Sequence, residues 1–301
     1  QETAKYTPRH KKEVLINLNI LHDTKRKFLS IIIGMKAERP KILGIVNITT
    51  DSFSDGGLYL NTDKAIEHAL QLTADGADII DLGAASSNPQ TSPVSVEEEI
   101  NRLRPVIKAL KEKRIAISVD TFKPEVQRFC LEQQVDYLND IQGFPYSEMY
   151  PDLARSTCKL IVMHSIQRIG PATITKTKPE ELPASITKFF SQRVDELKVA
   201  RVDSERLILD PGMGFFLGSD PESSIIVLKN IGQLKESFSL PLLIAISRKS
   251  FLGKITGSDV KIRGAATLAA EIYSYQAGAD YIRTHDVKAL SDAIKILERL
   301  S

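Results

Sequence analysis

From residue 42 onward, the chain alternates between short apolar runs that end in a polar residue and longer stretches with helical apolar spacing. This alternation is typical of parallel βαβ units, in which each strand is followed by a helix. Eight segments carry the strand pattern, and eight parallel strands are the number that closes a TIM barrel. The expected strands are 42–47, 78–82, 115–120, 135–140, 159–164, 206–210, 241–247 and 279–285.

The stretches between the expected strands predict amphipathic helices, because apolar residues recur three and four positions apart. One of them starts with a capping box, Ser95-Val96-Glu97-Glu98, which marks a helix N-terminus. The sets with helical spacing are Ala65, Ile66, Ala69 and Leu70; Ile100, Leu103, Ile107 and Leu110; Ile186, Phe189, Phe190, Val194 and Leu197; and Leu290, Ile294 and Leu297. We therefore expect an α/β fold, a (β/α)8 barrel, as one domain of the usual size of about 250 residues.

Residues 1–34 lack this alternation. They mix basic clusters with apolar runs at 14–21 and 28–33 that are far shorter than the ~20 residues of a membrane span. The second run is also short for a signal-peptide core and has no small-residue cleavage site. We expect 1–34 to be a poorly ordered N-terminal extension and 35–301 to be the catalytic domain, with the true start residue left open.

Charge and cysteine content narrow the function classes. With 40 basic and 38 acidic residues, the net charge is +2, too balanced for a general nucleic-acid-binding surface. Small anionic ligands remain compatible with this balance. The two cysteines, Cys130 and Cys158, form no CxxC pair, so we expect reduced thiols in a cytoplasmic protein and no disulfide framework.

The carboxyl ends of the expected strands are all polar. In a barrel these ends share one face, so residues far apart in sequence converge on one mouth. A single carboxylate or amide at such an end often caps the next helix instead, and that alternative applies to each residue taken alone. The strand ends are Asn47, Asp81, Asp120, Asn139-Asp140, His164, Asp210, Ser247-Arg248-Lys249 and Arg283-Thr284-His285.

Seven ordered motifs at these ends resemble the dihydropteroate synthases over residues 40–300. Seven ordered motifs on strand ends are far more specific than one short motif. The motifs are the segment 45–57 (Ile-Val-Asn-Ile-Thr-Thr-Asp-Ser-Phe-Ser-Asp-Gly-Gly), Asp78-Ile79-Ile80-Asp81-Leu82-Gly83, Ser118-Val119-Asp120-Thr121, Asn139-Asp140-Ile141, Leu209-Asp210-Pro211-Gly212, Ser247-Arg248-Lys249-Ser250 and Arg283-Thr284-His285-Asp286.

The resemblance implies an enzyme that condenses 6-hydroxymethyl-7,8-dihydropterin pyrophosphate with p-aminobenzoate, in folate biosynthesis. It implies catalytic roles for Asp120, Lys249, Asp210 and Arg283. It implies a pterin site of Asp81, Asp120, Asn139, Asp210, Lys249 and Arg283, and a pyrophosphate site of Asn47, Arg283 and His285, with Mg²⁺ on Asn47. The p-aminobenzoate site would comprise Phe53, Ser87, Pro89, Phe215, Phe216, Lys249 and Ser250. The loop 49–57 resembles a mobile lid, and a homodimer is implied by the family alone.

Two loops depart from the common form of this family. Asn88 stands where an arginine is usual, and the loop 210–218 is longer by two residues and carries Phe215 and Phe216. Together with the segments 142–145 and 163–168, these departures resemble the mobile, sulfonamide-insensitive members. Because both loops would face one substrate, we expect sulfonamide resistance, of unknown strength; ordinary packing of the two rings is the alternative.

Two other functions stay open at this point. A methyltransferase that binds methyltetrahydrofolate would share the barrel and some strand-end carboxylates, although the Ser247–Ser250 motif favours the synthase. A catalytically inactive barrel that serves as a scaffold would fit the missing charge at Asn88. An assay of pyrophosphate release separates the three hypotheses.

Overall fold

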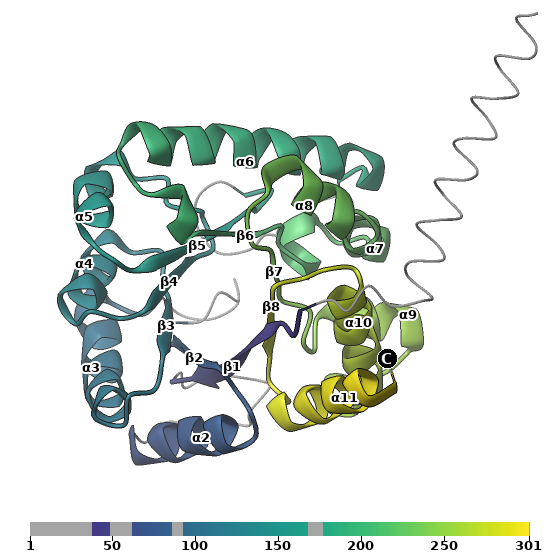
Figure 1. Cartoon of the computed structure of the whole chain (residues 1–301), viewed down its shortest axis with the longest axis horizontal. Helices are drawn as coiled ribbons and strands as arrows, with labels where there is room; N and C mark the ends of the chain where they lie inside the picture. The colour runs from purple at the N-terminus through teal and green to yellow at the C-terminus, as the bar shows by residue number, and fades with distance from the viewer. Residues whose placement is uncertain (1–37, 49–61, 86–92, 168–176, 301) are drawn as a thin grey trace, which may run out of the picture.

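The structure is a computed structural model that describes residues 38–48, 62–85, 93–167 and 177–300. Its eight parallel strands follow the order β6-β5-β4-β3-β2-β1-β8-β7. The ring closes between β6 and β7, where Leu209 and Leu242 form a parallel bridge and the Leu209 N–H donates to the Pro241 carbonyl at 2.9 Å. Figure 1 shows the strands as a ring with the helices outside it. The expected TIM barrel is confirmed.

All eight expected strands are present, within two residues at most boundaries. They are β1 (Lys41–Asn47), β2 (Ile79–Gly83), β3 (Ile117–Asp120), β4 (Tyr137–Asp140), β5 (Lys159–Met163), β6 (Leu207–Asp210), β7 (Leu243–Ile244) and β8 (Tyr281–Thr284). The exception is β7, expected at 241–247 but only two residues long. Residues 242–247 are all buried, so their apolar pattern reflects burial and not continuous strand pairing.

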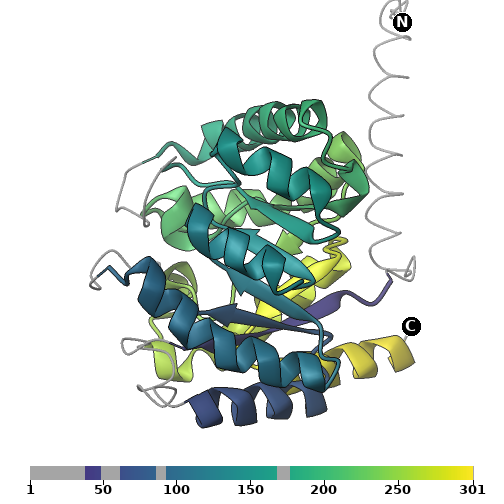
Figure 2. The same cartoon turned by 90° about the vertical axis from the view of Figure 1, so that its left-hand side faces the viewer.

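The helices also follow the apolar spacing, and Figure 2 shows them lying alongside the strands. At the start of α3, the Ser95 hydroxyl accepts the Glu98 N–H at 3.1 Å, as the capping box predicts. None of the described helices is long and apolar enough to cross a membrane. They are α2 (Thr62–Ala74), α3 (Val96–Glu112), α4 (Pro124–Glu132), α5 (Tyr150–Arg155), α6 (Leu182–Val199), α7 (Pro221–Lys229), α8 (Ile231–Phe238), α9 (Ser250–Thr256), α10 (Gly264–Gln276) and α11 (Val287–Leu300).

The barrel interior is built in layers, because alternate residues of each strand point inward. A compact cluster of buried residues forms the lower layer: Leu43, Ile79, Tyr137, Ile161, Ile208, Leu243, Ala245 and Tyr281. Two positions further along four of these strands stand Asp81, Asn139, Asp210 and Arg283. The next inward layer is therefore polar, and it lies at the carboxyl ends of the strands. We call Asp81, Asp120, Asn139, Asp210 and Arg283 the polar layer.

Candidate active site at the carboxyl ends of the strands

Arg283 links three strands across the polar layer. Its Nε donates to Asp81 Oδ2 at 2.6 Å and its Nη2 donates to Asp120 Oδ2 at 2.9 Å. Asp81 is fully buried, whereas the side chains of Arg283 and Asp120 keep 16% and 21% exposure toward the mouth. Burial opposes the charge of Arg283, but the carboxylates of Asp81 and Asp120 outweigh it and raise the pKa of the guanidinium. Arg283 is therefore a permanent cation at the mouth.

The pKa of Asp120 lies close to neutral pH. Burial raises its pKa to about 7, against the lowering effect of Arg283, and the neighbouring carboxylates Asp81 and Asp140 raise it further. Such a group changes charge near neutral pH and responds to a small change in its surroundings. A ligand that brings N–H donors or positive charge would shift Asp120 to the carboxylate form.

Asp210 and Lys249 form a second electrostatic pair in the mouth. Burial raises the pKa of Asp210 to about 6, while the Gly212 N–H, which donates to Asp210 Oδ1 at 2.8 Å, and Lys249 lower it. Burial and the nearby Arg283 lower the pKa of Lys249 to about 8, against the raising effect of Asp210 and Asp120. The mouth thus combines acceptors with an ammonium group, a donor set suited to a polar heterocycle.

Asn139 on β4 has an unused acceptor. Its side chain is 3% exposed, and its Oδ1 has no hydrogen-bond partner within the described ranges. The Ser118 hydroxyl on β3, which is fully buried, is in the same condition there. Buried polar atoms are nearly always paired, so unpaired ones at a barrel mouth indicate atoms that a ligand satisfies.

His285 follows β8 and is fixed by Ser247. The Ser247 Oγ accepts the His285 N–H at 3.1 Å and lies 2.9 Å from His285 Nδ1. Burial and the cations Arg248, Arg283 and Lys249 lower the pKa of His285, so its imidazole is neutral at pH 7. Ser250 begins α9 beside this loop and is half-buried.

Asn47 ends β1 opposite Gly83 of β2. A Cβ built on Gly83 would lie 3.4 Å from Asn47 Oδ1, so the glycine leaves room for the amide. In the part of the chain that the structure describes, no cluster of three or more His, Cys, Asp or Glu could hold a metal ion. Asn47 is thus a single oxygen donor, which fits Mg²⁺ only if a ligand's phosphates supply further oxygens.

Phe215 and Phe216 occupy different environments in the short turn η4 (Gly214–Leu217). Phe216 is 7% exposed and packs with Ile141, Met163 and Phe122, and the Lys249 Nζ lies 4.9 Å from its ring centroid. Phe215 is 39% exposed. Phe216 is therefore a wall of the mouth, and Phe215 is the ring that remains open to solvent.

Two polar strand ends have structural roles. Asp140 faces away from the polar layer: its carboxylate accepts Gln127 Nε2 at 2.9 Å and the N–H groups of Gln142 at 2.8 Å and Phe144 at 3.1 Å. His164 is 3% exposed and its Nδ1 lies 3.2 Å from the Pro211 carbonyl. These two residues therefore fix loops and a neighbouring helix at the strand ends, and neither of them caps a described helix.

Three expected p-aminobenzoate residues, Phe53, Ser87 and Pro89, lie outside the described residues, as do Asn88 and the expected lid 49–57. The sequence reading missed Phe122, which packs on Phe216, and Glu271, a buried acid on α10. An acid on the inner face of an amphipathic helix is the signal that identifies Glu271.

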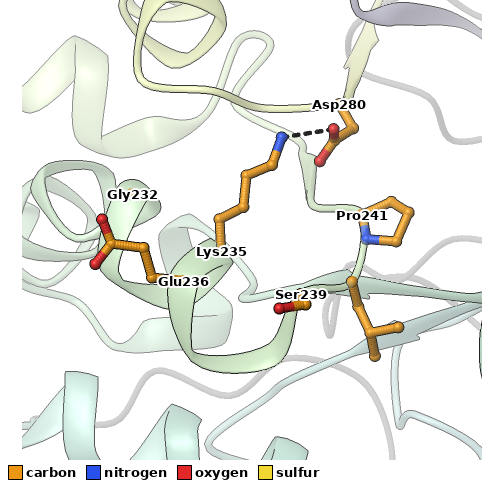
Figure 3. Close-up of a pocket in the computed structure, with 7 residues that line it drawn as sticks. Gly232, Lys235, Glu236, Ser239, Pro241 and Asp280 are labelled. Carbon is orange, nitrogen blue, oxygen red and sulfur yellow. Dashed lines mark hydrogen bonds and ion pairs between the residues drawn. The ribbon is translucent and has the colours of Figure 1, made fainter.

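A hollow lies at the end of the barrel opposite the polar layer, near the starts of β7 and β8. Figure 3 shows the Lys235 ammonium directed at the Asp280 carboxylate, 2.7 Å away. Asp280 Oδ2 also accepts the Leu242 N–H at 2.8 Å, and Lys235 donates to the Gly278 carbonyl at 2.9 Å. These groups satisfy one another, so this hollow of about 530 Å³ is held by structural contacts. The amino-terminal face of a barrel generally serves stability.

Comparison with known proteins relates this chain to pterin-binding enzymes. Residues 43–285 match a family described as pterin binding enzymes. The chain is 69% identical over 260 residues to dihydropteroate synthase type-3 of Escherichia coli, covering 86% of this chain and 99% of that protein. The Xanthomonas albilineans dihydropteroate synthase with 4-aminobenzoic acid has a TM-score of 0.78 and 33% identity, covering 88% of this chain and 94% of its own. The Anaplasma phagocytophilum enzyme with bound 6-hydroxymethylpterin-monophosphate has a TM-score of 0.77 and 36% identity, covering 87% and 99%.

Proposed function

The chain belongs to the family of pterin-binding enzymes and is a dihydropteroate synthase, and from this premise we propose how its own residues carry out the reaction. The enzyme joins 6-hydroxymethyl-7,8-dihydropterin pyrophosphate to p-aminobenzoate and releases pyrophosphate. The observation that supports our assignment is the polar layer, in which Arg283 bridges Asp81 and Asp120 at the barrel mouth. The methyltransferase and scaffold hypotheses have no support from these relatives.

The polar layer binds the pterin ring. The ring's amino and amide edge carries N–H donors, which suit the carboxylates of Asp120 and Asp210 and the unpaired Oδ1 of Asn139. Lys249 donates to the ring's acceptors, and the planar guanidinium of Arg283, oriented by Asp81, lies over its face. The ring's donors also stabilise the carboxylate form of Asp120, whose pKa of about 7 leaves it partly protonated in the free enzyme.

Asn47, Arg283 and His285 bind the pyrophosphate. Arg283 provides fixed positive charge, and neutral His285 provides a hydrogen bond. Asn47 would hold a Mg²⁺ ion through its amide oxygen, together with oxygens of the pyrophosphate. When bound, this ion would neutralise charge on the departing group.

The reaction breaks the bond between the pterin methylene carbon and the pyrophosphate oxygen, and both electrons leave with pyrophosphate. The positive charge that remains is delocalised over the pterin ring, where Asp120 and Asp210 stabilise it. The neutral amine of p-aminobenzoate then forms the new carbon–nitrogen bond, and its nitrogen loses a proton to water. Because the arylamine attacks in its neutral form, the enzyme needs no strong base.

The p-aminobenzoate site comprises Lys249, Ser250, Phe215 and Phe216, with Phe53, Ser87 and Pro89 from segments outside the described residues. Phe216 and Lys249 form its inner wall, since the ring and the ammonium group are in contact. Sulfonamides carry a substituent that projects beyond the envelope of p-aminobenzoate, and the ring of Phe215, which is 39% exposed, would block it. We include sulfonamide resistance in the proposal on this basis.

The experiment measures pyrophosphate released from pterin pyrophosphate with p-aminobenzoate, for the parent and for Asp120→Asn and Lys249→Ala. Each variant removes a charge-assisted contact, so we expect kcat/KM to fall about a hundredfold or more. The control is Lys295→Ala, because Lys295 is exposed on α11 and its ammonium group pairs with Asp292, which is not part of the polar layer. Folded Asp120→Asn or Lys249→Ala protein with near-parental turnover would refute the assignment of the pterin site.

A further inference from the structure

Helix α10 presents a polar face to β8 where a barrel helix ordinarily packs apolar residues. Its buried residues include Thr267, Glu271 and Ser274. The Thr267 hydroxyl accepts the Arg248 N–H at 3.2 Å, and Glu271 shares a side-chain hydrogen bond with Thr284 of β8. This polar contact ends at the loop that carries His285.

Glu271 has an unusual environment for an acid. It is 1% exposed, and no cation of the described chain forms an ion pair with it. Burial raises its pKa to about 8 against the lowering effect of the hydrogen bond with Thr284, and Asp286 raises it further. Glu271 is therefore mainly a neutral carboxylic acid at pH 7, which carries an O–H that can donate a hydrogen bond.

Thr284 and Ser247 extend this contact as a chain of hydroxyl groups. The Thr284 Oγ1 accepts the Asp286 N–H at 3.1 Å and lies 3.4 Å from Ser247 Oγ. The Ser247 Oγ accepts the His285 N–H at 3.1 Å and lies 2.9 Å from His285 Nδ1. Glu271 is thus connected to the imidazole through two hydroxyl groups.

Each hydroxyl can donate one hydrogen bond and accept two, and this limits the directions of the chain. Each already accepts one backbone N–H. If the Glu271 acid donates to Thr284, Thr284 must donate to Ser247 and Ser247 must donate to His285 Nδ1. The neutral imidazole then carries its proton on Nε2. If Glu271 were a carboxylate, Thr284 would donate to it and could not donate to Ser247. Ser247 could then donate to Thr284 and accept a proton-bearing Nδ1, so the tautomer with its proton on Nε2 would no longer be imposed.

We propose that Glu271 is a positioning residue that, as a neutral acid, holds His285 in the tautomer with its proton on Nε2. In that tautomer, Nε2 donates a hydrogen bond to an anion while Ser247 fixes the ring through Nδ1. The inference rests on the proposed role of His285 at the pyrophosphate. The tautomer of His285 would thus be controlled by a residue on α10, outside the loop that carries the imidazole.

Burial and the surrounding charges favour the neutral form of the imidazole. Cations near His285 oppose its protonation, so the neutral imidazole must exist as one of two tautomers and only one can donate toward the mouth. One oxygen of Glu271, Oε1, has no hydrogen-bond partner among the described residues, which suits an uncharged acid better than a carboxylate. The charged or titratable groups near this chain are Arg248, Arg283, Lys249 and His68 for His285, and Asp286 for Glu271.

The test is a ¹⁵N NMR measurement of the histidine tautomers in the full chain, which has only five histidines to assign. Variants are Glu271→Met, which removes the donor at similar volume, Glu271→Gln, which keeps an N–H donor, and Thr284→Val, which interrupts the chain. We expect the Nε2–H signal of His285 in the parent and in Glu271→Gln, and a loss or mixture in the other two. A parent His285 with its proton on Nδ1, or an unchanged Nε2–H signal in Glu271→Met and Thr284→Val, would overturn the inference.

Binding of inorganic pyrophosphate separates this inference from the proposed function. We expect Glu271→Met and Thr284→Val to weaken pyrophosphate about five- to tenfold, the effect of one hydrogen bond, with the affinity for 6-hydroxymethylpterin unchanged. Glu271→Gln should restore the affinity. If His285→Ala binds pyrophosphate as the parent does, the proposed role of His285 is wrong. If only His285→Ala loses affinity, the role of Glu271 is wrong.

Discussion

At the scale of single residues, the site gathers charged groups at a cost in stability. Burial raises the pKa of both Asp120 and Asp210, so folding opposes their ionisation at neutral pH. Asp81 and Arg283 offset part of this cost by direct pairing. A binding site that needs its charges for a ligand commonly lowers the stability of the free protein.

Asp210→Asn should therefore stabilise the free protein near pH 7.5. The pKa of Asp210 rises from 3.8 to about 6 on folding, so its contribution to stability is fully present below 3.8 and lost as pH rises through about 6. The asparagine oxygen still accepts the Gly212 N–H but cannot ionise. We expect Tm to rise by about 2–6 °C at pH 7.5 and the gain to vanish toward pH 4.

Thermal unfolding of parent and variant across this pH range checks the prediction. Asp203→Asn is the control, because Asp203 caps an exposed turn through the Glu205 N–H and is not part of the polar layer. A loss of Tm at pH 7.5 in Asp210→Asn would show that the carboxylate stabilises the fold.

At the scale of elements, the sequence predicted the strands well because parallel strands that are buried on both faces leave short continuous apolar runs in the sequence. The sequence indicated Asp81 and Arg283 only as polar strand ends, and the structure shows that they point inward, two positions beyond Ile79 and Tyr281. The length of β7 could not be predicted, because burial without pairing produces the same apolar run. The sequence also could not predict which residue of Asn139-Asp140 faces inward. Neighbouring residues of a strand point to opposite faces, and both of these residues are polar.

The turn η4 gives a prediction at this scale. Phe216 packs against Met163 and Lys249, so its removal should lower catalysis or stability. Phe215 is exposed, so its ring should instead obstruct ligands that are larger than p-aminobenzoate. We expect Phe215→Ala to lower the ratio of the sulfonamide inhibition constant to the p-aminobenzoate KM by roughly thirtyfold or more, as relief of a clash worth about 2 kcal/mol.

The matched variant is Phe216→Ala, for which we expect no such selective change. Steady-state inhibition by a sulfonamide with a large substituent gives the ratio for both proteins. If the parent enzyme is already sensitive to sulfonamides, or if Phe215→Ala leaves the ratio unchanged, Phe215 does not exclude these drugs and only packs in the loop.

At the scale of the whole molecule, the barrel brings residues from positions 81 to 283 into one layer, and Arg283 directly contacts strands distant in sequence. The family match spans 43–285, so the segment 1–34 lies wholly outside it. We predict that a protein starting at Met35 retains activity and a similar Tm. Circular dichroism melts and the pyrophosphate assay test this, and an insoluble or clearly less stable product would show that the segment completes the barrel.

The central claim is that the inward polar layer, and not polar strand ends in general, forms the active site. Asp210 and Asp140 provide a matched pair, since both are buried carboxylates at strand ends with pKa values raised to about 6 by burial. The deciding measurement is kcat/KM for pterin pyrophosphate, per folded molecule, in Asp210→Asn and Asp140→Asn. We expect a loss of about a hundredfold for Asp210→Asn and near-parental values for Asp140→Asn. Equal losses in the two variants, or a loss confined to Asp140→Asn, would contradict it.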